Sequence, residues 1–388
     1  MTDAEYISRR IELLRPRAKF VAFSHSNEFI DKSANLGDGF HYANLYDEQI
    51  DSNVISSPRG LLMIHNTYLS SFAYNLLLCR LLYAGDDSNE GKTNLKRLLK
   101  HNFKKYFAEQ LFAAHNNIFS RAILLETLLY EQQMMVPVFG AKARDESLSR
   151  NADIGAQLMS SALSFHELGH FYLDNTPQLW DEILANFPDV LTDLYKEVSE
   201  NYPSQFVEEF RCDIISAISC FDQYQTETDK TFRLRLIVFS FAAFAVLYSL
   251  TKSAQKTTSD KKSVGDEVDF ESIEKKHIEY DYTIGLDLDF IERAKLVKNF
   301  CRLLAEKENL KLYEKNGIFP LEENILEDLL SCVDFVMESD DPNARSLSLL
   351  VAEAFHNHSE GMEYLYLRSK TFVFGSDRNA DGNLKNHK

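Results

Sequence analysis

The chain has 388 residues, of which 45% are hydrophobic, and its formal net charge is −17 at neutral pH. This composition is typical of a soluble globular protein with a sizeable core, and it excludes an intrinsically disordered chain. The acidic balance, with no sustained run of Lys or Arg, argues against nucleic acid as a partner, because phosphate contacts need a basic patch.

The hydrophobic pattern predicts an α+β fold that is mainly α-helical, with a small sheet near the N-terminus. Two short runs rich in β-formers predict strands at residues 19–23 and 40–46. Helical periodicity is expected over the segments 60–84, 94–132, 152–173, 178–200, 205–222, 231–251, 287–309, 321–338 and 343–370. The polar stretch 252–266 predicts a flexible loop, and the tail 375–388 is expected to be disordered.

Residues 166–170 read His-Glu-Leu-Gly-His, which is the metal-site motif H-E-x-x-H. Positions four apart share one face of a helix, so the imidazoles of His166 and His170 can meet on one Zn²⁺, with Glu167 beside any water that the metal holds. Burying these groups in an apolar helix without partners is costly, and a metal would satisfy them. The alternative is a helix with two ordinary core histidines and a surface glutamate.

A two-histidine zinc site needs a third protein ligand. The metzincin extension requires Gly at position 173 and His at position 176, and the chain has Leu and Thr there. Asp174 would lie about 9 Å along the helix axis from the metal, which is too far for its short side chain. The predicted helix at 205–222 offers Glu209 and Asp213, which share one face. The alternative for both is an ordinary acidic residue on a helix surface.

The order HExxH and then ExxxD, here Glu209-Phe-Arg-Cys-Asp213, resembles the gluzincin metallopeptidases. The likeness covers residues 152–219, and a looser one extends to phage-exclusion peptidases of the Lit type. It implies a zincin-like core in which the two motif helices pack together, within a metallopeptidase region at 1–251. It also implies that Glu209 is the third zinc ligand and that Asp213 orients a ligand histidine. Residues 267–374 would then form a helical C-terminal region without a motif of its own.

The resemblance also implies residues that contact substrate. Many gluzincins carry a His-Pro pair followed by an Arg beyond the ExxxD helix, and this chain has no such His-Pro pair. The nearest analogues are candidate oxyanion or substrate contacts, namely His277, Tyr280, Tyr282 and Arg293. The alternative is that each of them is a structural or surface group.

Gluzincins usually bind substrate along an edge strand beside the HExxH helix. We expect residues 134–139 to be that strand, because Pro137 cannot donate to an inner ladder. An extended polypeptide would pair there as an additional strand.

The function that follows is that of a zinc-dependent endopeptidase acting on a polypeptide substrate, in a bacterial defence or regulatory role. Glu167 would be the general base toward the attacking water. The alternative is a helical interaction protein whose metal site is structural or inactive.

The five cysteines show neither paired CxxC spacing nor the density of a disulfide scaffold, and the first 20 residues lack the apolar core of a signal peptide. A cytoplasmic location is therefore expected. Residues 236–250 are continuously apolar but short for a bilayer span of about 20 residues, so a buried core helix is favoured over membrane association. The sequence leaves the oligomeric state open.

Overall fold

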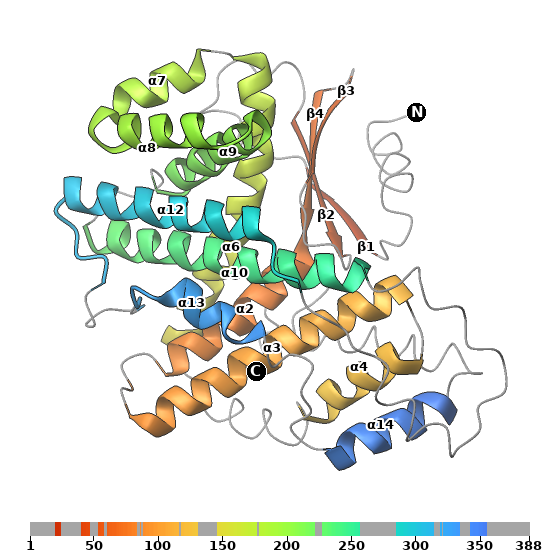
Figure 1. Ribbon diagram of the computed structural model, residues 1–388. Helices are drawn as coiled ribbons and strands as arrows, with labels where there is room; N and C mark the ends of the chain where they lie inside the picture. Colours follow the sequence, from red (N-terminus) through yellow and green to blue (C-terminus); the bar gives the residue numbers. More distant parts are fainter. Residues whose placement is uncertain are drawn as a thin grey trace.

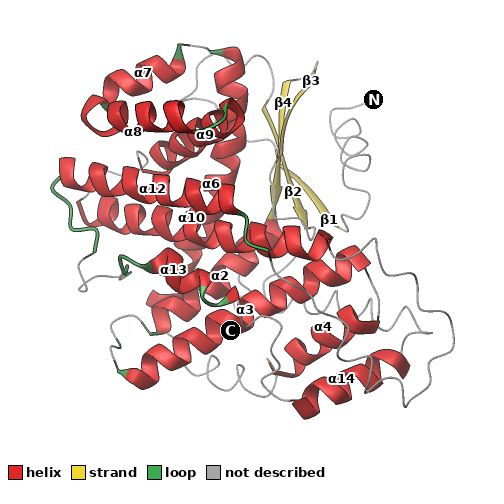
Figure 2. Ribbon diagram, in the orientation of Figure 1, coloured by secondary structure: helices red, strands yellow, loops and turns green. Residues whose placement is uncertain are grey.

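The computed structural model describes most of the chain, namely residues 20–24, 40–46, 53–57, 60–83, 86, 88–115, 118–130, 146–176, 178–221, 227–256, 285–313, 319, 321–333 and 342–354. Helices dominate these residues, as predicted (Figure 2). Several expectations lie outside the described residues: the edge strand at 134–139, the side chains of His277, Tyr280 and Tyr282, the loop from 257 to 266, and the tail from 375.

Among the residues that the structure describes, four strands form a sheet in the order β1-β2-β4-β3: β1 (Phe20–Ser24), β2 (Phe40–Tyr46), β3 (Asn53–Ser57) and β4 (Gly60–Asn66). β2 and β4 run parallel, and the other two pairs are antiparallel. Residues 60–66 were expected to begin a helix, and this was wrong. A short apolar run has no decisive period of its own, and here its backbone groups pair with strands on both sides.

The helices that follow the sheet are α2 (Thr67–Leu82), α3 (Asn89–His115) and α4 (Ile118–Tyr130). Where a single helix was expected over 94–132, the described residues form two helices, α3 and α4. Near the end of the described chain, α14 (Pro342–Ala354) packs against α4, far from the end of the molecule that carries α7 and α8 (Figure 1).

The motif helix is α6 (Glu146–Asn175), which extends beyond the predicted 152–173 at both ends. After it come α7 (Leu179–Asn186), α8 (Pro188–Asn201) and α9 (Ser204–Phe221). A single helix was expected over 178–200, but Pro188 begins a second one. Proline lacks an N–H and restricts the residue before it, so Phe187 leaves the helical conformation and α8 starts anew.

The C-terminal part of the core contains α10 (Glu227–Lys256), α12 (Leu288–Lys307) and α13 (Ile325–Leu330). Residues 252–256 belong to α10, so the loop expected from 252 cannot begin before residue 257. By length and composition alone, residues 230–255 of α10 could cross a membrane. However, 89% of the most apolar stretch of this segment is buried inside the protein. The prediction of a buried core helix at 236–250 is thus confirmed.

The packing of these helices positions the two motif helices side by side. α6 lies between α2 and α9, contacts β3 and β4 of the sheet, and packs against α10. α12 packs against α10 and α9. One hydrophobic cluster runs through all of these helices, from Tyr68 on α2 to Val333 after α13. α10 and α12 therefore flank the polar face that α6 and α9 present to each other.

Candidate metal centre

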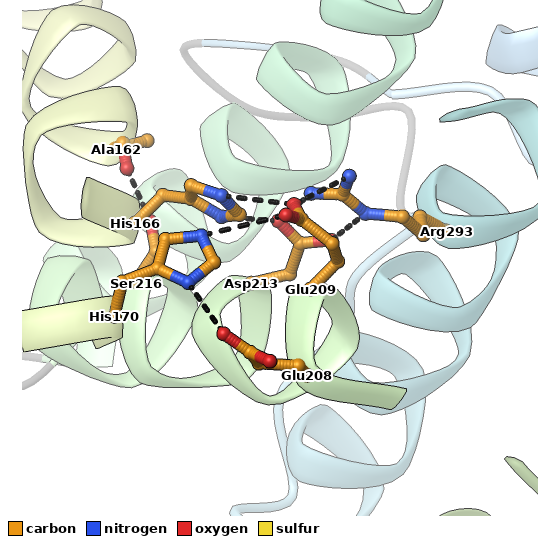
Figure 3. Close-up of polar contacts among 8 residues, drawn as sticks. All are labelled: Ala162, His166, His170, Glu208, Glu209, Asp213, Ser216 and Arg293. Atoms are coloured by element: carbon orange, nitrogen blue, oxygen red, sulfur yellow. Dashed lines mark hydrogen bonds and ion pairs between the residues drawn. The ribbon is translucent and has the colours of Figure 1, made fainter. Parts of the chain in front are cut away.

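The two histidines of the motif lie one turn apart on α6 and face α9 (Figure 3). Their rings are 5.0 Å apart between centroids and nearly perpendicular. His166 is buried, whereas the side chain of His170 is 28% exposed. The helical spacing of the motif therefore places both imidazoles on the same side of one helix, as expected from the sequence.

The helices α6 and α9 approach each other closely beside the histidines. A Cβ on Gly169 would lie 3.1 Å from the Cα of Cys212 and 3.2 Å from its Cβ, so an alanine would push the two helices apart by a few tenths of an ångström. One helical turn away, the Ser216 hydroxyl donates a hydrogen bond of 2.6 Å to the backbone carbonyl of Ala162. These two contacts set the distance across which Glu209 reaches the imidazoles.

Glu209 meets both histidines. Its Oε2 lies 3.2 Å from His166 Nε2, and its Oε1 lies 3.5 Å from His170 Nε2. The three residues offer ligand atoms that all lie within 4.8 Å of one another. Tetrahedral zinc ligands at 2.0–2.2 Å from the metal are about 3.3–3.6 Å from each other. The donor set and its spacing therefore fit a zinc ion with three protein ligands.

The outward nitrogen of each imidazole has a carboxylate partner from α9. Asp213 Oδ1 lies 2.8 Å from His166 Nδ1, and Glu208 Oε1 lies 3.2 Å from His170 Nδ1 (Figure 3). A carboxylate on Nδ1 holds the proton there and leaves Nε2 to bind metal. Asp213 is the residue that the sequence assigned to this role. Glu208 was not singled out from sequence, because acidic residues on helix surfaces are common.

Arg293 enters the site from α12, although it is 80 residues away from Asp213. Its Nε and Nη2 donate to Asp213 at 2.7 and 2.8 Å, and its Nη1 lies 2.9 Å from Glu209 Oε2. The sequence suggested Arg293 as a contact for substrate. The structure places its guanidinium against the two site carboxylates, where it is buried.

The charges of this network balance in the metal-free protein. Burial by itself would lower the pKa of His166, but the hydrogen bonds and charges of Asp213 and Glu209 outweigh it and raise the pKa to about 9. The hydrogen bond to His166 lowers the pKa of Glu209. Burial opposes ionisation of Asp213, yet Arg293 and His166 hold its pKa below the usual range. At neutral pH, two cations thus face two carboxylates.

A cavity of about 160 Å³ opens beside the donors. Its polar wall includes His166, His170, Glu209 and also Glu167. Its apolar wall is mainly aromatic: Phe241, Phe244 and Tyr248 of α10 and Phe290 of α12 line it, beside Ala162 and Leu163 of α6. Tyr248 and Phe290 stack with their centroids 4.1 Å apart. The i, i+3, i+7 spacing of the three α10 aromatics was visible in the sequence, but it is equally typical of an ordinary core face.

An open groove of about 510 Å³ lies near the outer side of His170. Its walls come from the end of α6, the end of α8 and the start of α9, and they include Asp174, Tyr202, Glu208 and Arg211. Asp174, which helix geometry excluded as a ligand, is thus part of the groove, and the ligand cluster found in the structure does not contain it. The groove and the cavity share no lining residue, but Glu208 of the groove contacts His170 of the cavity.

Comparisons of the chain with protein-family models, with characterised proteins and with solved structures find no significant match.

Proposed function

We propose that this protein is a zinc-dependent endopeptidase that hydrolyses a peptide bond in a polypeptide substrate. The observation that carries the proposal is the convergence of His166, His170 and Glu209 at one cavity that Glu167 also lines. Three donors with a carboxylate beside open space match a catalytic zinc site, which keeps one position for water.

Bound zinc would supply a Lewis acid and bring the pKa of water toward neutrality. Glu167 then accepts the proton of the attacking water and delivers it to the leaving amine. Asp213 and Glu208 hold the two imidazoles with Nε2 directed inward, and Arg293 holds Glu209 and Asp213 in place. Glu167 thus moves the proton, and the other three residues hold the proposed zinc ligands in place.

The cavity distinguishes this proposal from its alternative, a helical interaction protein with a structural metal. A structural zinc site is closed by four protein ligands and needs no space beside it. Here three donors face about 160 Å³ of space with an aromatic wall. Such a lining suits an organic substrate, since ligand sites combine apolar walls with a few placed polar groups.

The sheet supports a zincin-like arrangement. α6 contacts β3 and β4, and β3 is the outermost strand on that side among the strands that the structure describes. An outer strand offers unpaired backbone groups to an extended polypeptide. We therefore extend the proposal to substrate pairing beside α6, a role that the sequence assigned to residues 134–139.

The test is to compare wild type with Glu167→Gln. We expect both to bind one zinc with similar affinity, and we expect the variant to lose about 10²–10⁴-fold in turnover, as for removal of a general base. Proteome-wide identification of new N-termini after induction of each form would measure cleavage and identify targets. Glu200→Gln, at an exposed position on α8, controls for the loss of one charge.

Equal sets of new N-termini from wild type and Glu167→Gln would remove Glu167 from the mechanism. Stoichiometric zinc in a wild type that cleaves nothing would favour the structural alternative. Absence of zinc binding by wild type would overturn the metal centre itself.

A further inference from the structure

The two ligand histidines are oriented by carboxylates of very different character. The Asp213 side chain is 1% exposed and is also bound by Arg293. The Glu208 side chain is 53% exposed and lines the open groove. His166 is therefore oriented by a carboxylate in the protein interior, whereas His170 is oriented by a carboxylate at the surface.

The position of Glu208 follows from the geometry of α9. Consecutive residues on a helix are about 100° apart, so Glu209 can face both imidazoles while Glu208 flanks the outer one. Its Oε1 accepts from His170 Nδ1 at 3.2 Å, on the side of the ring opposite to the Nε2 that meets Glu209. Glu208 thus contacts a proposed ligand and also forms part of the groove wall.

We infer that Glu208 is a positioning residue for His170, through which the open groove is coupled to the metal centre. This inference rests on the proposed zinc site. The hydrogen bond fixes which nitrogen of His170 faces the metal and limits rotation of a ring that is itself 28% exposed. His170 is therefore the ligand whose orientation depends on the groove, whereas His166 is held from inside.

The test measures metal binding without any substrate. Zinc affinity of the purified full chain is determined by competition with a chromophoric chelator, and the dissociation rate by transfer to excess chelator. Glu208→Ala is expected to weaken zinc binding about tenfold, at the lower end of the 10–100-fold loss typical of such partners. Glu208→Gln retains an oxygen acceptor and is expected to recover most of the affinity.

Asp174→Ala is the matched control, because it removes a carboxylate from the same groove and lies outside the ligand cluster. Its zinc affinity is expected to equal that of wild type. The visible spectrum of the Co²⁺-substituted protein gives a second readout: Glu208→Ala should change the ligand-field bands, and Asp174→Ala should leave them unchanged.

Equal zinc affinity, dissociation rate and Co²⁺ spectrum in wild type and Glu208→Ala would overturn the inference while leaving the zinc site intact. An equal loss in Asp174→Ala would also overturn it, because the effect would then be the general charge of the groove. Failure of wild type to bind zinc would instead overturn the proposed function.

Discussion

Arg293 donates hydrogen bonds to both carboxylate oxygens of Asp213, from Nε to Oδ2 at 2.7 Å and from Nη2 to Oδ1 at 2.8 Å. Both side chains are buried, and Asp213 Oδ1 also meets His166 Nδ1. The pair joins α12 to α9 at the point where α9 meets the motif helix. The candidate metal centre therefore depends on a helix that begins more than 60 residues after α9 ends.

Removing Arg293 should destabilise the whole protein. In Arg293→Met, Asp213 and Glu209 lose a buried cationic partner, and breaking a buried pair on one side costs about 3–5 kcal/mol. Urea unfolding of the metal-free protein measures the loss as a lower midpoint. We expect Arg293→Lys to recover only part of the stability, because an ammonium cannot reproduce the two parallel hydrogen bonds to Asp213.

Arg302→Met provides the control for this experiment. Arg302 lies on the same helix and pairs with Glu306 at 2.7 Å, but its side chain is 45% exposed. Surface pairs of this kind contribute about 0.3–0.5 kcal/mol. Equal destabilisation by the two substitutions would show that the contact between Arg293 and Asp213 stabilises the fold no more than a surface ion pair does.

Gly169→Ala should weaken metal binding without unfolding the protein. The new Cβ would lie 3.1 Å from the backbone of Cys212, so α9 must move by a few tenths of an ångström, and Glu209 moves with it. This shift takes up much of the tolerance of about 0.5 Å that the geometry of a metal site allows, so we expect zinc affinity to fall, by up to about tenfold.

The comparison for Gly169→Ala is Gly155→Ala on the same helix. A Cβ there would meet the ends of the Leu77 and Leu236 side chains, and neither of these residues lies on α9. Its zinc affinity should be unchanged. If Gly169→Ala bound zinc as tightly as wild type, α6 and α9 could accommodate the added methyl group without displacing Glu209.

Zinc affinity should depend steeply on pH. The pKa of His166 is about 9 in the metal-free protein, so zinc must displace its proton at neutral pH. Below pH 9 the apparent affinity should fall about tenfold per pH unit. Calorimetry at pH 7.5 in two buffers of different ionisation enthalpy should show release of at least one proton, and no release would contradict the raised pKa.

The free energy of unfolding of the metal-free protein should also depend on the protonation of His166, and it should fall as the pH rises. The folded pKa of His166 is raised from 6.5 to about 9, so its stabilising contribution is fully present below pH 6.5 and is lost as the pH rises through 9. Urea midpoints measured from pH 6 to pH 9.5 would show this decline. In His166→Gln the decline should be absent.

The cysteines should be unreactive while the protein is folded. All five are buried, and burial raises the pKa of Cys220 to about 12 and that of Cys332 to about 11. Thiolate is the reactive form, so a thiol reagent at pH 8 should label none of them within minutes and all five after unfolding. Rapid labelling of Cys212, which lies against the motif helix, would show that α6 and α9 separate in solution.

The sequence by itself predicted what depends on local spacing. The histidines of the motif share a helix face because they are four residues apart, and Glu209 and Asp213 share one for the same reason. The apolar run at 236–250 indicated a buried helix, since its length is short for a membrane. The helix break at Pro188 was missed although the proline itself signals it, because the hydrophobic period continues on both sides of the break.

Only the tertiary structure decided which distant groups meet this site. Arg293 reaches Asp213, Glu208 reaches His170, and the aromatic residues of α10 form the wall of the cavity. A helical sequence pattern specifies a face, but not the helix that will cover it. The close packing at Gly169 and the large hydrophobic cluster around the site set those pairings, because a buried charge is stable only where the fold places a partner beside it.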